Sequence, residues 1–426
     1  MRYSLMKKVT LILAVVMLVV VTVCTTYFCT FQGVYRDAQE ELEGVIEKYE
    51  STYGDYTRLM DVIRQFEELY VTDLALDREE IVDSLIYDYL YLTGDVYADY
   101  YTPEELEEMQ REMNGNVSGI GVQVSYDPDA DAIQVFYVVD GSPAEAAGIL
   151  PDDRITAVKS ESGVWQYVSE QGYSEIVALV AGEIGTTVEL LVERPGIAEP
   201  IPFSIVRAAF VSKTVHYKTC AADEKIGYVR ITEFNNTTPG GFAEAFDTLL
   251  DAGCDSIVVD LRSNPGGYLN SVAEVLDMIL PEGPMVRTID KDGNEEIICC
   301  ASGDAPYVDV PIAVLVNDGT ASAAELFSIA VQDYTKRGEM QATVVGIQTF
   351  GKGCMQTTKM MPDGAAVKVT YRMFCGPYAP NFHGVGVTPD VSVAMTDKWA
   401  TRSVYLVPEA EDNQLAAAIA VLHPNH

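Results

Sequence analysis

Histidine is scarce in this chain of 426 residues, which contains only four. His423 and His426 lie in the terminal tail, and no Gly-x-Ser-x-Gly motif is present. A Ser-His-Asp hydrolase needs a histidine beside its nucleophilic serine. The scarcity therefore argues against that class of enzyme.

Basic residues are also few. The chain has 28 Lys and Arg against 64 Asp and Glu, which gives a formal net charge of −36. Nucleic-acid binding depends on clustered Lys and Arg that neutralise phosphates, so this composition argues against that function. The simplest interpretation of the acidity is a soluble, self-repelling surface.

Cysteines are sparse and form no Cys-x-x-Cys pair. Six follow the apolar N-terminal run, and an even number would permit disulfides in an exported chain. Neither a zinc site nor a redox site is supported by their spacing. We expect mostly buried or free thiols, and neither a metal nor another cofactor.

One long apolar run stands near the N-terminus, at residues 9–30. About 20 such residues span a bilayer. Arg2, Lys7 and Lys8 precede the run and an acidic chain follows it, which places the N-terminus in the cytoplasm and the rest outside. A cleaved signal peptide is the alternative, but the run is long and has no small-x-small site at its end. We predict a single-pass cell-membrane anchor within residues 1–33.

The apolar pattern then changes along the chain. Residues 34–70 have a helical rhythm and are interpreted as a stalk, and residues 71–112 predict two further helices. Alternating apolar runs at 113–208 indicate a β-rich domain. Strands and helices alternate over 209–400, which predicts an α/β layer with parallel pairing ahead of a C-terminal segment at 401–426.

Ser322 stands where a predicted buried strand, residues 312–316, gives way to a helix. A serine at that point is usually an N-cap, which accepts hydrogen bonds from free backbone N–H groups. The same position suits a nucleophile, because the helix N-terminus stabilises negative charge and the Ala323 N–H could help to hold an oxyanion.

A nucleophilic serine needs a base, and a lysine can serve if burial lowers its pKa. Lys352 lies between two glycines, which would let another chain approach closely. In an extended segment Gln356 would share its face and could orient the amine. One alternative is a surface lysine in a glycine turn. Another, a phosphate-binding loop at 346–353, is disfavoured because Gly353 replaces the required hydroxyl residue.

A third segment, residues 260–267, reads Asp-Leu-Arg-Ser-Asn-Pro-Gly-Gly. It joins a predicted buried strand to a helix. The plain interpretation is an ordinary strand–helix turn. The functional one is a loop whose free N–H groups complete an oxyanion hole.

Together the three segments resemble the carboxyl-terminal processing peptidases, or tail-specific proteases. The family pattern of DLRxNPGG, NxGSASASE and TFGKGxxQ is matched at 260–267, 317–325 and 349–356. The resemblance covers about residues 75–425. It implies an α/β (α+β) fold in which a PDZ domain at 113–208 is inserted ahead of a ClpP/crotonase-like protease core.

The resemblance also implies roles for individual residues. Ser322 matches the nucleophile, Lys352 the general base and Gln356 the residue that positions the base. Ala323 and Gly266 match the backbone oxyanion donors. In the PDZ domain, the loop that resembles the carboxylate-binding loop contains Gly119, Ile120, Gly121 and Val122. Consecutive N–H groups there would hold a C-terminal carboxylate, and the next strand could add a peptide at its edge.

We therefore expect a membrane-anchored serine endopeptidase that cleaves proteins near their C-termini. The PDZ domain would capture the substrate tail and could gate activity. The expected partners are peptides with free C-termini and the membrane, and the N-terminal helices could support a homodimer. A non-catalytic tail-binding scaffold is one rival, against which the intact Ser, Lys and Gln argue. An esterase or amidase is the other, and the PDZ-like domain favours peptides over it.

Overall fold

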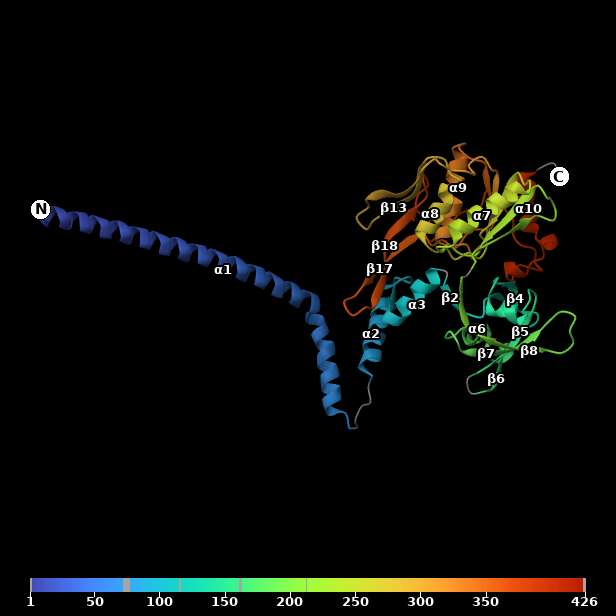
Figure 1. Ribbon diagram of the computed structural model, residues 1–426, viewed down its shortest axis with the longest axis horizontal. Helices are drawn as coiled ribbons and strands as arrows, with labels where there is room; N and C mark the ends of the chain where they lie inside the picture. Colours follow the sequence, from blue (N-terminus) through green and yellow to red (C-terminus); the bar gives the residue numbers. More distant parts are fainter. Residues whose placement is uncertain (1, 72–76, 115, 161–162, 212, 424–426) are drawn as a thin grey trace. The chain divides into compact units, whose positions relative to one another are not determined.

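The computed structural model describes residues 2–71, 77–114, 116–160, 163–211 and 213–423. It divides into two compact units, Met1–Ser84 and Leu85–His426. In the first, α1 (Arg2–Leu69) is a single helix of 68 residues (Figure 1). The predicted anchor and stalk are therefore continuous, since no proline interrupts them. Within α1, Val15–Gln32 has a mean hydropathy of 1.9 and is long and apolar enough to cross a membrane.

The second unit is built on a six-stranded sheet in the order β10-β11-β12-β15-β16-β19. Its central strands pair in parallel, as the alternating pattern predicts. The edge strand β10 is antiparallel to β11. The strands are β10 (Val215–Thr219), β11 (Ile226–Ile231), β12 (Ser256–Asp260), β15 (Ile312–Val316), β16 (Ala342–Gly346) and β19 (Val391–Ser392).

Helices cover both faces of this sheet. Side chains on β12 alternate, so that Ile257 and Val259 enter the largest core while Val258 enters another. The largest core also contains side chains of α7 (Thr238–Asp251), α8 (Leu269–Asp277) and α9 (Ala323–Lys336), and the other contains those of α10 (Asn413–Leu422). Every residue of β12 and β15 is buried, as a parallel sheet covered on both faces requires.

A second, antiparallel sheet stands beside the first, and the sequence analysis did not predict it. Its order is β1-β18-β13-β14, with β17 also paired to β18. The strands are β1 (Asp99–Tyr101), β13 (Gly283–Ile289), β14 (Glu295–Ala301), β17 (Cys354–Met360) and β18 (Ala366–Cys375). Two helices precede most of it in the chain, α2 (Arg78–Thr93) and α3 (Pro103–Met113), both at predicted positions. This sheet carries the strand that follows Lys352.

A separate β-rich domain lies between α3 and β10 in the chain, with a hydrophobic core of its own. Its sheet runs β3-β4-β5-β7-β8, with β6 paired to β5, and a β2–β9 ribbon lies apart from it. The strands are β2 (Asn116–Gly119), β3 (Val122–Asp127), β4 (Ala132–Val138), β5 (Arg154–Lys159), β6 (Trp165–Tyr167), β7 (Thr187–Glu193), β8 (Ile201–Val206) and β9 (Ala208–Val211). The helices are α4 (Pro143–Ala147), α5 (Val168–Gln171) and α6 (Tyr173–Val180).

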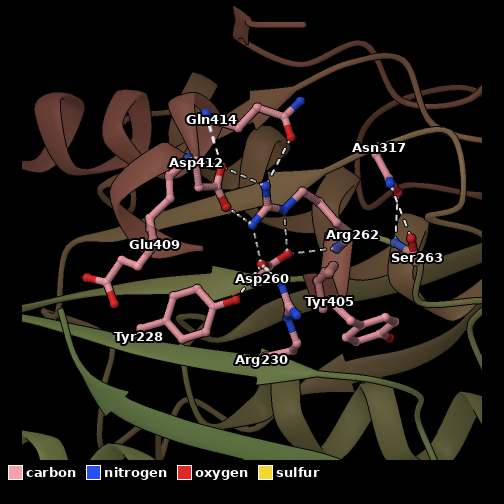
Figure 2. A network of polar contacts seen from close by, with 12 residues as sticks. Tyr228, Arg230, Asp260, Arg262, Ser263, Asn317, Tyr405, Glu409, Asp412 and Gln414 are labelled. Atoms are coloured by element: carbon pink, nitrogen blue, oxygen red, sulfur yellow. Dashed lines mark hydrogen bonds and ion pairs between the residues drawn. The ribbon is translucent and has the colours of Figure 1, made fainter. Parts of the chain in front are cut away.

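A buried polar network fixes the carboxyl end of β12 (Figure 2). The Asp260 carboxylate, which has no exposed surface, accepts hydrogen bonds from Tyr228 at 2.6 Å, Arg230 at 2.6 Å and Arg262 at 2.6–3.0 Å. Burial alone would raise the pKa of Asp260, but the two guanidinium groups hold it well below its usual range. The charged form of Asp260 is therefore the stable one in the folded protein.

The same network reaches the C-terminal helix. Arg262 donates to both oxygens of Asp412, at 3.0 and 2.7 Å. Asp412 is also the N-cap of α10, since its carboxylate accepts from the Gln414 and Leu415 N–H groups. Arg262 thus ties the start of α10 to the loop that follows β12.

We predict that Arg262→Ala lowers the free energy of unfolding by about 3–5 kcal/mol, because it removes the guanidinium group that pairs with the buried Asp412 carboxylate and one of the two that pair with Asp260. Chemical denaturation followed by circular dichroism measures the change. Lys213→Ala is the matched control. It breaks an ion pair with Asp140 in which the two side chains are 52% and 64% exposed, and should cost less than about 1 kcal/mol. Equal losses in the two variants would contradict the prediction.

Candidate active site

Ser322 occupies the turn between β15 and α9 in an unusual backbone conformation. It stands at the N-cap position of α9 with φ 55° and ψ −115°, whereas an ordinary N-cap serine is extended. Positive φ is rare for residues other than glycine, and such strained residues cluster at functional sites. The turn is held on one side by the Ala321 N–H, which donates to the Asn264 carbonyl at 2.9 Å.

The Glu325 carboxylate binds the other side of this turn. It also binds residues 349–352, which we call the lysine loop. Glu325 lies in the first turn of α9 and has no exposed surface. One oxygen accepts from the N–H groups of Ser322 and Lys352, both at 2.8 Å. The other accepts from the Thr349 hydroxyl at 2.6 Å and the Gly351 N–H at 2.7 Å. A single buried carboxylate therefore fixes both backbones relative to each other.

Sequence reasoning did not assign Glu325 a role. Two signals were present, because Ser322 and Glu325 have the spacing of a capping box and the glutamate closes the second family segment. Nothing in the local sequence indicates the hydrogen bonds between Glu325 and the lysine loop, because they join positions that are far apart in the chain.

Lys352 lies in a crowded, partly buried loop rather than on an open surface turn. A Cβ atom on Gly353 would lie 2.5 Å from the His383 backbone nitrogen, and one on Gly351 would lie 3.1 Å from that of Gly386. The flanking glycines thus admit the close approach of another segment of this chain, as expected. Burial lowers the pKa of Lys352, which favours the neutral amine that a general base needs.

The Lys352 amine itself faces an aromatic ring. Its Nζ atom lies 4.6 Å from the ring centroid of Tyr97, which is within the range of a cation–π contact. The sequence analysis did not identify Tyr97, because nothing local to that tyrosine signals a lysine partner.

Gln356 lies two residues beyond Cys354 on β17, next to an irregularity in its pairing with β18 between Met355 and Gln356. Its amide nitrogen donates to the Thr370 hydroxyl at 3.1 Å and to the Cys354 thiol at 3.3 Å. In the part of the chain that the structure describes, Lys352 is not among its hydrogen-bond partners. The predicted positioning of the amine by Gln356 is therefore not present as a direct bond in this conformation.

The loop at residues 260–267, which follows β12, lies directly against Ser322. A Cβ atom on Gly266 would lie 2.7 Å from the Ser322 Cβ and 2.9 Å from the Ala323 backbone nitrogen. Only glycine fits there. The backbone φ of 104° at this position also favours glycine, which has no Cβ. The Gly266 N–H donates to the Asn264 side chain at 2.8 Å. The Ala323 N–H has no acceptor among the described residues, so it is free to bind a developing oxyanion.

The loop at Gly119–Val122 is anchored through its carbonyl groups. The Ile120 carbonyl accepts from the Ala144 N–H at 2.8 Å, and the Gly121 carbonyl accepts from the Val139 N–H at 2.9 Å. Val122 begins β3, which lies at the edge of its sheet. An edge strand that follows such a loop is the geometry by which an extended peptide is added to a sheet.

The described residues offer few other reactive groups. Among them, no group of three or more His, Cys, Asp or Glu side chains is placed to hold a metal ion. Seven of the cysteines within the described ranges are free thiols. A serine hydroxyl, a lysine amine and a free backbone N–H are the groups that acyl transfer requires.

Comparisons with known proteins give two family matches. The profile of Peptidase family S41 matches residues 225–393, and that of the PDZ domain matches residues 134–194. A probable CtpA-like serine protease of Staphylococcus saprophyticus is 30% identical over 417 residues, which cover 96% of this chain and 77% of that protein. A carboxyl-terminal-processing protease of Synechocystis is 32% identical over 327 residues, covering 76% of this chain and 73% of the relative.

A solved structure shows the same fold. A Bacteroides fragilis protein assigned to the S41 proteases superposes with a TM-score of 0.56 at 17% sequence identity. The match covers 84% of this chain and 92% of that one.

We predict that Glu325→Gln slows the reaction of Ser322 with a fluorophosphonate probe by about 100-fold. In either orientation the amide puts its NH2 group opposite one of the two pairs of donors, which lie in the serine turn and the lysine loop. Misplacing a reacting group by about 1 Å has effects of that size. Asp333→Asn is the matched control on the same helix. It alters a buried carboxylate that accepts from the Tyr378 and Ala379 N–H groups, so it should lower stability and leave labelling unchanged. Wild-type labelling of Glu325→Gln would contradict the prediction.

Proposed function

Because this chain belongs to the S41 family of C-terminal-processing serine proteases, we propose that Ser322 is its nucleophile and Lys352 its general base. The main support for this proposal is the buried Glu325 carboxylate, which binds the backbone N–H groups of both residues at 2.8 Å. The strained Ser322 backbone and the lowered pKa of Lys352 support the same assignment. Strained backbones and shifted pKa values both cluster at active sites.

In the proposed reaction, the neutral Lys352 amine takes the proton from the Ser322 hydroxyl as its oxygen attacks a peptide carbonyl. The resulting ammonium passes that proton to the leaving amine as the peptide bond breaks, and an acyl-enzyme remains. Lys352 then deprotonates the water that hydrolyses the ester. The Ala323 N–H stabilises the oxyanion in each step, with the Gly266 N–H as the second donor once it is released from Asn264.

Gln356 acts on the base indirectly in this proposal. Its amide donates to Cys354, the second residue after Lys352, and to Thr370 on β18. Those two bonds hold the strand that leads out of the lysine loop. Gln356 thereby orients Lys352 through the backbone.

The PDZ domain supplies the proposed selectivity for substrate tails. The N–H groups of residues 119–122 would receive a C-terminal carboxylate, and β3 would pair with the residues before it. Capture at one site and cleavage at another would restrict the enzyme to proteins with free, extended C-termini.

The junction between this domain and the protease core is suited to gating. The Phe136 ring on β4 stacks on Tyr405 at 4.2 Å, and Tyr137 meets His216 edge-on at the same distance. A cavity of about 610 Å³ lies among these four side chains. Aromatic side chains that line a cavity can repack, so we propose that tail binding shifts this junction.

Residues 1–33 form the proposed anchor, with the catalytic part outside the cytoplasm. The apolar window in α1 and the basic residues before it support this orientation. Homodimerisation through the N-terminal helices stays a prediction.

The decisive experiment compares the full-length wild type with Ser322→Ala and Lys352→Met in detergent. The substrate is an unstructured protein with an apolar C-terminus. We expect cleavage by the wild type and a loss of at least about 1,000-fold in each variant, since a nucleophile and its base act as one unit. Unchanged unfolding curves would show that both variants fold. Cleavage by Ser322→Ala would refute the assignment.

The same assay separates the rival functions. A scaffold would neither cleave the substrate nor react with a fluorophosphonate probe. An esterase would hydrolyse a p-nitrophenyl ester and spare the protein.

We predict that Phe136→Ala raises kcat/KM about 2- to 10-fold on a short peptide that lacks an apolar tail. The stack with Tyr405 holds the PDZ domain in place, and an aromatic pair of this kind contributes about 0.5–1.5 kcal/mol. Phe136→Tyr keeps the ring and should behave as the wild type does. Equal activity of all three proteins would show that this junction does not gate cleavage.

A further inference from the structure

Tyr97 reaches the active site from a part of the chain that precedes the PDZ domain. It lies between α2 and β1, and β1 is bound to β18 through the pairing of Asp99 with Lys368. The Lys368 amine also donates to Asp99 at 3.2 Å and to the Tyr101 hydroxyl at 2.6 Å. These contacts attach the segment to the sheet that carries the lysine loop.

Asp95 fixes Tyr97 more closely. Its carboxylate accepts from the Tyr97 N–H at 3.0 Å and from the N–H and hydroxyl of Thr370 at 3.0 and 3.1 Å. Thr370 in turn is the residue that binds the Gln356 amide. Asp95 therefore holds Tyr97 directly and also holds Thr370, the residue that binds Gln356.

We propose that Tyr97 is a positioning residue for the catalytic lysine, whose ammonium it holds on its ring face between turnovers and releases as the neutral amine. The inference rests on the proposed role of Lys352. Its geometry is the 4.6 Å contact of the Lys352 Nζ with the Tyr97 ring, with the His383 ring set edge-on to the same tyrosine at 6.2 Å.

The chemistry of a ring suits this task better than that of a carboxylate. A ring face attracts an ammonium but offers little to a neutral amine, so the contact weakens when the proton leaves. A carboxylate at that place would bind the ammonium far more strongly and keep it charged at working pH. The ring thus holds the ammonium without preventing the amine from becoming a base.

Several charged and titratable groups around Lys352 act in opposite directions. Burial and the nearby Lys368 favour the neutral amine, while Cys354 and Asp95 favour the ammonium. The Glu325 carboxylate is bound to the Lys352 N–H. Tyr97 contributes to the ammonium side of this balance, so its removal should make the neutral amine available at lower pH.

The test uses the full-length protein in detergent as wild type, Tyr97→Phe and Tyr97→Leu. Two quantities are measured from pH 5 to 10, kcat/KM on a peptide substrate and the rate constant of fluorophosphonate reaction with Ser322. We expect Tyr97→Phe to keep the wild-type midpoint of the acid limb, because it keeps the ring. Tyr97→Leu should move that midpoint down by about half to one pH unit in both profiles.

An unshifted midpoint in Tyr97→Leu, whatever its maximal rate, would overturn the inference and leave Tyr97 a packing residue. Thermal unfolding checks that each variant folds, and Tyr97→Met replaces Tyr97→Leu if the latter does not. The Lys352→Met variant shows whether the inference about Tyr97 fails alone or the proposed function fails with it. If Lys352→Met reacted with the wild-type pH profile, Lys352 would not be the base, and both proposals would fall.

Discussion

The active site depends on one buried carboxylate. Glu325 has no exposed surface, and its two oxygens accept from backbone and hydroxyl donors of the serine turn and the lysine loop. A carboxylate accepts in several directions at once and donates in none, so it can gather donors from two segments that are distant in sequence. The strained backbone of Ser322 persists because these bonds over-determine it.

A second polar network performs the same task for the third segment. Asp260 and Arg262 fix the end of β12, and the loop beyond it brings Gly266 against Ser322. Both networks lie at the carboxyl ends of parallel strands, where an open α/β sheet presents its loops to a ligand. The serine therefore has rigid, buried residues on one side and the free Ala323 N–H on the other.

Local patterns sufficed for the elements whose apolar spacing is regular. The parallel α/β layer, the β-rich domain and the position of Ser322 before α9 could all be predicted from the chain. The antiparallel sheet could not, because its parts, the β13–β14 hairpin, the β17–β18 hairpin and β1, are widely separated in sequence and join one another only through tertiary contacts. Tyr97 was not predicted for the same reason, since its contact with Lys352 joins distant parts of the chain. Simple alternation of side chains suggests that the Gln356 amide faces Lys352, but the strand pairing beside Gln356 is irregular.

The clamp between Arg262 and Asp412 has a consequence for folding. Asp412 caps α10, whereas Arg262 belongs to the loop beside the serine, and 150 positions separate the two residues in the chain. The loop therefore acquires its partner only when a contact of very long range has formed. The surroundings of the serine are in this sense a property of the assembled fold and of no local segment.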